Sequence, residues 1–263
     1  MQKFFVNTNQ IDTENNIIKI EGEDVNHIKN VLRCVVGEKI EVCEKSENPS
    51  KYICEIAGFE QNQVRCNIVN KIEDNNESNV KLHIFQGLPK AEKMELIIQK
   101  CTELGVCEFI PTQMNRCVVK MSGKDQEKKI SRWQKIAEVA SKQCGRDIIP
   151  NIRNITSLKE IASEINNYDI MLLAYENENE NFLKDIIKNI KLENKEINIG
   201  IIIGPEGGIE EKEVELLENA GAKVVSLGKR ILRTETVAFV MSSILQYELG
   251  DLGGITKEWK TMF

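Results

Sequence analysis

IGIIIGPEGGIEEKEVELLENAGAKVVSLGKRILRTETVAFVMSSILQYELGDL, residues Ile199–Leu252, is the stretch that decides the fold of this chain. Its β-branched start, Ile199–Ile203, predicts a strand that runs directly into a glycine-rich loop, Gly204–Gly208 (GPEGG). A helix-like segment, a short strand at Val224–Leu227 and a second glycine-bearing loop, Leu227–Thr236, precede a final amphipathic helix. Loops that follow adjacent parallel strands meet at one edge of the sheet, where α/β proteins bind ligands.

The two loops could hold a ligand against bare backbone, because glycine accepts positive φ and leaves room beside the chain. The GPEGG loop matches neither a P-loop nor a G-x-G-x-x-G motif, so a nucleoside or amino-acid-like ligand fits it better than a triphosphate. In the second loop, Leu227, Ile231 and Leu232 accompany Gly228 and could cradle a flat adenine. The alternatives are an ordinary strand-to-helix turn for the first loop and a hydrophobic cap on the core for the second. Thr234 is a candidate N-cap of the final helix.

The composition indicates a globular protein in a reducing compartment. The chain has 263 residues, enough for one large or two small domains, and 41% of them are hydrophobic. Its apolar runs are shorter than the roughly 20 residues of a membrane span, and the start MQKFFVNTNQ lacks the apolar core of a secretion signal. Eight cysteines form no C-x-x-C motif and two histidines accompany them, so we expect free thiols, no metal site and a cytoplasmic location.

Hydrophobic patterns divide the chain into two expected domains, 1–72 and 73–263. In the first, helical spacing from Asp24 to Leu32 interrupts four short runs that predict strands: Ile17–Ile20, Lys39–Cys43, Tyr52–Ile56 and Val64–Ile68. Polar, turn-rich residues 72–79 predict a linker. From Lys81 onward, strands and helices alternate, which predicts the α/β class, with a parallel sheet covered by helices on both faces.

Positive charge is concentrated in the middle of an otherwise acidic chain. The net charge is −6, yet residues 81–153 hold 14 Lys and Arg against 8 Asp and Glu. Such an excess is typical of a surface that contacts phosphate, although a basic solvated helix face is the plain alternative. The candidate contacts are Lys90, Lys93, Arg116, Arg132 and Arg146, joined by Lys29 and Arg33 near the N-terminus.

Five sequence blocks, taken in order, resemble those of the RsmE family of SPOUT-class methyltransferases, which methylate N3 of a uridine in 16S ribosomal RNA. The blocks are HIKNVLR from His27 with Gly37-Glu38, KAEKMELIIQKCTELG from Lys90, RWQKIA from Arg132 with QCGR from Gln143, and the loops Gly204–Gly208 and Leu227–Glu235. The chain departs from the family at Cys117 and Cys144, where serine is frequent, and at Val237, where alanine is frequent.

The resemblance implies a PUA-like RNA-binding β-barrel over 1–72 and a SPOUT α/β-knot methyltransferase domain, with a trefoil knot and a parallel sheet, over 73–263. It also implies a homodimer that uses S-adenosyl-L-methionine (SAM) and acts on 16S rRNA, free or within the assembled small ribosomal subunit, without a membrane or metal partner. The implied SAM-binding residues are Leu172, Leu173, Ala174, Ile203, Gly204, Glu206, Gly207, Gly208, Leu227, Gly228, Ile231, Leu232, Arg233 and Thr236. The implied RNA-binding residues are Lys29, Arg33, Lys90, Lys93, Arg116, Arg132 and Arg146.

The implied reaction has to move a proton, because uridine N3 is protonated at neutral pH and must lose its proton before or during methyl transfer. Arg233 is the candidate that stabilises the resulting anion or binds a phosphate, and Glu206 and Glu235 are candidate bases or orienting groups. Both glutamates could instead be structural, Glu235 as an acid at the N-terminus of a helix and Glu206 as a backbone clamp. Two other functions stay open: a SPOUT methyltransferase acting on a ribose 2′-hydroxyl or on tRNA, and a non-catalytic ribosome-assembly factor.

Overall fold

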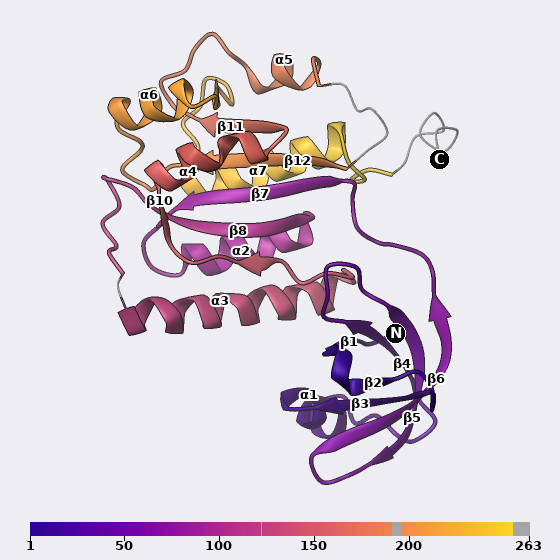
Figure 1. The fold of residues 1–263 in the computed structure, drawn as a ribbon. Helices are drawn as coiled ribbons and strands as arrows, with labels where there is room; N and C mark the ends of the chain where they lie inside the picture. Colours follow the sequence, from indigo (N-terminus) through magenta and orange to yellow (C-terminus); the bar gives the residue numbers. More distant parts are fainter. Residues whose placement is uncertain (122, 191–195, 255–263) are drawn as a thin grey trace. The chain divides into compact units, whose positions relative to one another are not determined.

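The computed structural model describes residues 1–121, 123–190 and 196–254 of the chain, which form two compact units (Figure 1). Unit 1 consists of Met1–Glu77 together with Ser141–Ile149. Unit 2 consists of Ser78–Ala140 and the chain from Pro150 onward. Residues 141–149 fall within the second of the two domains expected from the sequence, whereas in the structure they belong to unit 1.

Unit 1 contains a curled sheet of six strands in the order β1-β4-β5-β6-β3-β2, with β1 parallel to β4 and the other neighbours antiparallel. The strands are β1 Lys3–Val6, β2 Ile11–Asp12, β3 Ile17–Glu21, β4 Lys39–Glu44, β5 Lys51–Phe59 and β6 Gln63–Ile72. A 3-10 turn, η1, spans Thr8–Gln10, and α1 (Glu23–Asn26) continues into a π-helical turn, η2 (His27–Val31). Val25 and Ile28 of this helical segment are buried with alternate strand residues such as Ile18 and Ile40, which together form the core of the unit.

A buried ionic network holds residues 141–149 within unit 1. The Asp147 carboxylate lies 2.7 Å from Lys3 Nζ and 2.9 Å from Lys51 Nζ, and all three side chains are almost fully buried. Burial alone would raise the pKa of Asp147, but hydrogen bonds from Lys3 and Lys51 outweigh it and lower that pKa. Glu77 accepts the backbone N–H of Asp147 at 2.9 Å. A segment distant in sequence therefore neutralises two lysines of the N-terminal sheet.

Unit 2 contains an all-parallel sheet of seven strands, in the order β10-β8-β7-β12-β11-β13, with β9 also paired to β8. The strands are β7 Val80–Gly87, β8 Val106–Gln113, β9 Asn151–Ile152, β10 Thr156–Ser157, β11 Ile170–Ala174, β12 Ile197–Ile203 and β13 Lys223–Val225. Both faces of such a sheet are covered, which explains why β12 is apolar from Ile199 to Ile203 and why Ile199, Ile201 and Ile202 are fully buried.

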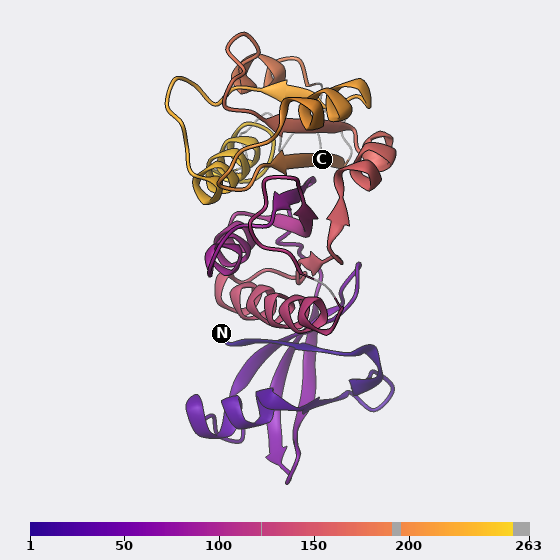
Figure 2. The ribbon, with the colours of Figure 1, turned by 90° about the vertical axis from the view of Figure 1, so that its left-hand side faces the viewer.

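Helices cover both faces of the parallel sheet. They are α2 Lys93–Glu103, α3 Gly123–Cys144, α4 Leu158–Glu164, η3 Ile165–Asn167, α5 Leu183–Ile187, α6 Glu211–Asn219 and α7 Thr234–Glu248. Helices α2 and α7 pack together on one face, and α4 and α6 pack together on the other (Figure 2). The predicted α/β class with a parallel sheet, preceded by a small β module, is confirmed. Among the described residues, no helix has the length and apolar composition that a membrane crossing requires.

Candidate functional site

Both glycine-bearing loops border one cavity at the carboxyl edge of the parallel sheet. Strands β11, β12 and β13 run in the same direction, so the loops that follow them emerge at one edge. The cavity has a volume of about 140 Å³. Ile203, Val225, Leu227 and Leu232 supply apolar walls, and the backbone of the two glycine-bearing loops supplies polar groups.

Close packing leaves little space beside the glycines of the first loop. A Cβ on Gly204 would lie 2.7 Å from a neighbouring side-chain carbon, and a Cβ on Gly208 would collide with the Glu176 carboxylate. Gly208 also has a φ of +74°, in the left-handed region that favours glycine. Gly87, at the end of β7, is packed as tightly, since its Cβ would lie 2.7 Å from Pro205. The GPEGG sequence therefore permits close approach of the backbone as well as the turn.

A buried chain of hydrogen bonds ties the first loop to the start of α7. The Thr234 hydroxyl donates to the Gly204 carbonyl at 2.7 Å and accepts from Gln86 Nε2 at 2.8 Å. Gln86 is fully buried at the end of β7, and its Nε2 also donates to the Gly87 carbonyl at 3.0 Å. The predicted N-cap role of Thr234 is wrong, because Arg233 occupies the N-cap position and Thr234 lies inside the helix. Thr234 instead joins the two loops that border the cavity.

Lys93 forms ion pairs with Glu206 and Glu235, the two glutamates predicted as candidate catalytic groups. Its Nζ lies 3.1 Å from Glu206 Oε1 and 3.1 Å from Glu235 Oε2. Glu206 Oε1 also accepts the backbone N–H of Lys90 at 3.1 Å. Burial alone would raise the pKa of Glu206, but backbone hydrogen bonds and the Lys93 ammonium lower it. A carboxylate with a lowered pKa is a weaker base, so Glu206 is better suited to hold its loop than to accept a proton.

The cavity brings together eight of the residues that the resemblance implied for the cofactor. These are Ala174, Ile203, Gly204, Gly208, Leu227, Gly228, Ile231 and Leu232. Leu172 and Leu173 are instead fully buried within β11. The other four, Glu206, Gly207, Arg233 and Thr236, belong to the same two loops and the first turn of α7 but do not line the cavity.

Several lining residues were missed by the sequence reasoning, among them Glu176 and Ser226. The available signal for Glu176 was its position directly beyond a strand next to the glycine-rich loop.

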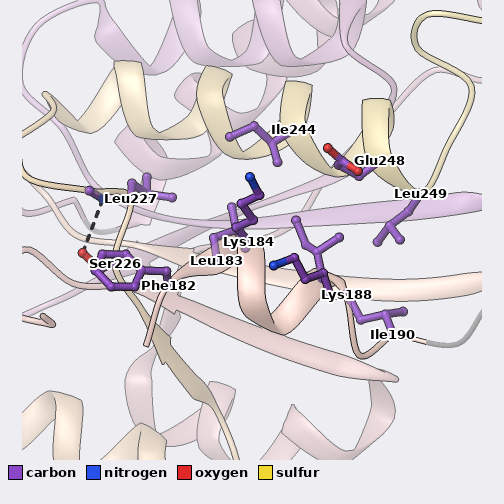
Figure 3. Close-up of a pocket in the computed structure, with 12 residues that line it drawn as sticks. Phe182, Leu183, Lys184, Lys188, Ile190, Ser226, Leu227, Ile244, Glu248 and Leu249 are labelled. Carbon is purple, nitrogen blue, oxygen red and sulfur yellow. Dashed lines mark hydrogen bonds between the residues drawn. The ribbon is translucent and has the colours of Figure 1, made fainter. Parts of the chain in front are cut away.

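A larger and more apolar cavity lies between α5 and α7 (Figure 3). Its volume is about 660 Å³, and it shares residues 226–228 with the first cavity. Lys184 and Lys188 of α5 and Glu248 of α7 accompany its apolar side chains, and the Lys184 amino group points toward Ile244. This cavity is bordered by one glycine-bearing loop, whereas the smaller one is bordered by both. The smaller cavity is therefore the candidate site.

Most of the predicted RNA-contacting residues have accessible side chains. Arg33, Lys90, Arg116 and Arg132 are exposed, although Arg116 donates to the Gly207 carbonyl at 3.1 Å and Arg132 pairs with Glu95 at 2.7 Å. Lys29 is half-buried, with its Nζ 5.8 Å from the centre of the Phe59 ring, and Lys93 is half-buried against its two glutamates.

The structure argues against Arg146 as an RNA contact, contrary to the prediction from the sequence. It is 6% exposed, and its guanidinium forms a buried ion pair with Glu77. In the sequence it stands between a glycine and an aspartate near a proline, which suggested an open loop. Its partner Glu77 is far away in the chain, so the pairing left no local signal.

Within the described residues, one trio of potential metal ligands comes together: Glu41, Cys43 and Asp147, with ligand atoms within 4.8 Å of one another. Lys3 Nζ lies 2.9 Å from Glu41 and 2.7 Å from Asp147. This ammonium group supplies the positive charge that the two carboxylates require.

Residues 76–246, more than half of the chain, match the RNA methyltransferase domain family, and residues 20–68 match the RNA methyltransferase PUA domain family. Ribosomal RNA small subunit methyltransferase E of Bacillus subtilis (strain 168) is 36% identical over 259 residues, which cover 97% of this chain and 99% of that protein. The protein of the same name in Mesomycoplasma hyopneumoniae (strain 232) is 32% identical, with 92% and 97% covered.

A solved structure extends the likeness to the fold. The crystal structure of a ribosomal RNA small subunit methyltransferase E from Neisseria gonorrhoeae, bound to S-adenosyl methionine, has a TM-score of 0.82 to this chain. The two are 26% identical in sequence, and the match covers 95% of this chain and 99% of the other. The resemblance read from the five sequence blocks is confirmed. The chain belongs to the RNA methyltransferase family whose members carry the name ribosomal RNA small subunit methyltransferase E.

Proposed function

We propose that this protein transfers a methyl group from SAM to N3 of a uridine in 16S ribosomal RNA. The observation that carries the proposal is the cavity bordered by the Gly204–Gly208 and Leu227–Arg233 loops, at the sheet edge where α/β proteins bind ligands. The family relation supports it, since relatives are named ribosomal RNA small subunit methyltransferase E and one neighbour is described as bound to S-adenosyl methionine.

The cavity suits the parts of SAM. Its apolar walls match an adenine, and the backbone at Gly228 is open, since a Cβ there would meet nothing within 4 Å. Its 140 Å³ is below the roughly 300–1,000 Å³ of pockets that enclose a ligand of this size. The rest of the molecule would therefore extend along the second loop, where Ile231 is 85% exposed. When bound, SAM would supply an electrophilic methyl group on a sulfonium.

Arg233 is the residue that we propose for the uridine anion or an adjacent phosphate. It occupies the N-cap position of α7, its side chain is exposed, and its guanidinium has no partner among the described residues. A free guanidinium there would favour the deprotonated form of N3 and would add to the positive end of the helix dipole. Glu206 and Glu235, both bound by Lys93, are proposed as orienting groups that hold the first loop and the first turn of α7.

RNA would be held through its phosphates. The exposed cations Arg33, Lys90, Arg116 and Arg132 are the proposed contacts. Each phosphate contact to a single strand contributes a slope of about −0.7 to the plot of log affinity against log salt concentration. Replacing one of these residues should therefore weaken binding and flatten the plot by roughly that amount.

The wider context of the reaction is also a proposal. We infer a homodimer that works in the cytoplasm on 16S rRNA within the small ribosomal subunit. Unit 1 would be its PUA-like barrel and unit 2 its SPOUT domain, in place of the expected division into 1–72 and 73–263. The trefoil knot is part of the same proposal, and it requires the chain to cross back from β13, at the edge of the sheet, to α7, which packs on β7 and β12 in its middle.

Nucleoside mass spectrometry tests the proposed reaction. Purified protein is incubated with methyl-labelled SAM and with small subunits or free 16S rRNA from a strain that lacks the gene. The expected product is 3-methyluridine in 16S rRNA. A 2′-O-methylated nucleoside, or label in tRNA, would move the chemistry to another RNA position. Absence of labelled RNA together with absence of SAM binding would favour an assembly factor.

A further inference from the structure

Glu176 occupies a distinctive place at the candidate site. It lies two residues beyond Ala174, the last residue of β11, and β11 pairs in parallel with β12, the strand that leads into the GPEGG loop. Its side chain lines the same cavity as that loop. Its Oε1 lies over the bare backbone of Gly208, next to the position that a Cβ of residue 208 would take.

The carboxylate of Glu176 has no hydrogen-bond or ion-pair partner among the described residues. Glu178, in the same loop, is different, because its carboxylate accepts the backbone N–H groups of Glu180 and Asn181 at 2.7 and 3.0 Å. Hydrogen bonds of this kind lower the pKa of Glu178 and hold it within its own loop. Glu180, the third carboxylate of the loop, is exposed and does not line the cavity, so Glu176 is the one available to a ligand there.

The arrangement of strand ends indicates which ligand group it would meet. In parallel α/β sheets that bind nucleosides, a glycine-rich loop follows one strand and an acidic residue beyond the neighbouring strand accepts hydrogen bonds from the ribose. Here β12 precedes the glycine-rich loop and β11 precedes Glu176. An adenine held by the apolar walls, such as Leu227 and Leu232, would carry its ribose to the polar rim of the cavity.

We propose that Glu176 is a cofactor-binding residue that accepts hydrogen bonds from the 2′- and 3′-hydroxyls of the SAM ribose. This inference rests on the proposed function, because it needs a nucleoside in the cavity. A ribose diol presents two O–H donors to one carboxylate, and hydrogen bonds to a charged acceptor are about twice as strong as neutral ones. Glu176 would thus select a ribonucleoside cofactor over a deoxy analogue.

Calorimetric binding of three ligands to the full-length protein tests this assignment. The ligands are SAM, S-adenosylhomocysteine, which lacks the sulfonium charge, and the 2′,3′-dideoxy analogue of S-adenosylhomocysteine, which keeps the ammonium group and lacks the ribose hydroxyls. Glu176→Ala should weaken SAM and S-adenosylhomocysteine by the same factor, about tenfold. It should leave the affinity for the dideoxy analogue unchanged. Glu180→Ala removes an equal charge from the same loop and should leave all three affinities unchanged.

Other outcomes would overturn the assignment. Loss of affinity for SAM alone would place the sulfonium at Glu176, and an equal loss for all three ligands would place the ammonium group there. Unchanged affinity for SAM in Glu176→Ala would remove this residue from the site. Failure of the wild-type protein to bind SAM or S-adenosylhomocysteine would instead contradict the proposed function itself.

Discussion

Thr234→Val should destabilise the protein by breaking the link between the two loops of the cavity. Valine has nearly the shape of threonine, so packing is preserved, but the donor to the Gly204 carbonyl and the acceptor for Gln86 Nε2 are both lost. Gln86 keeps its bond to Gly87, so the Gly204 carbonyl suffers most. Two lost hydrogen bonds, one of which leaves a carbonyl unsatisfied, cost about 2–3 kcal/mol. Thr234→Ser keeps the hydroxyl and loses one methyl group, at a cost of about 0.8 kcal/mol.

Thermal unfolding of the variants checks this estimate. A loss of 1 kcal/mol lowers Tm by roughly 2–4 °C in a domain of 150–250 residues, so Thr234→Val should unfold about 4–12 °C below the wild type and Thr234→Ser about 2–3 °C below it. Thr236→Val changes a half-buried threonine in the same turn that forms no side-chain hydrogen bond with the described residues, and should unfold near the wild type. If Thr234→Val and Thr234→Ser had the same Tm, the hydroxyl would play no part and the reasoning would be refuted.

Three further changes address the ion pairs of the two units. Lys93→Met should weaken SAM binding roughly fivefold, because Glu206 and Glu235 lose their shared cation. Lys100→Met removes an exposed ion pair with Glu103 and should leave the SAM Kd unchanged. Burial would lower the pKa of His83, but hydrogen bonds with Cys107 and Glu108 raise it to about 10. The protonated His83 therefore stabilises the folded protein fully below pH 6.5, and this contribution is lost as pH rises through about 10. Tm profiles of the wild type and of His83→Asn should therefore converge over that range, and parallel profiles would contradict it. Asp147→Asn leaves the buried Lys51 without its close carboxylate and Lys3 with Glu41 alone, and should lower the free energy of unfolding by about 3 kcal/mol, against no measurable change for the exposed Asp185→Asn.

Local pattern revealed those parts of the fold that rest on continuous burial or on glycine. Strand β11 and residues 199–203 of β12 are apolar because both faces of a parallel sheet are covered, and the glycines of the GPEGG loop indicate close backbone packing. Strands β9 and β10 are two residues long and form by pairing with β8. Two residues are too few to show the hydrophobic alternation that predicts a strand.

The candidate site was predicted only in part from the sequence. The loops were visible as loops, whereas the partners of their charged residues were not. Glu206 and Glu235 were candidate catalytic or structural groups, yet their shared partner, Lys93 from another element, was not foreseen. Arg146 looked like a free base, yet Glu77 buries it. The sequence identifies the charged residues. It does not identify their ion-pair partners, because these lie in distant segments of the chain.

The return of the chain to unit 1 limits how the protein can be divided. The chain leaves unit 1 at Glu77 and enters it again for Ser141–Ile149. A gene break after Glu77 would separate Lys3 and Lys51 from Asp147. An N-terminal unit transferred to another protein as Met1–Glu77 alone would therefore lack the carboxylate that neutralises two of its buried lysines. A single cut in the gene does not separate the two units, because unit 1 is encoded on both sides of Ser78–Ala140.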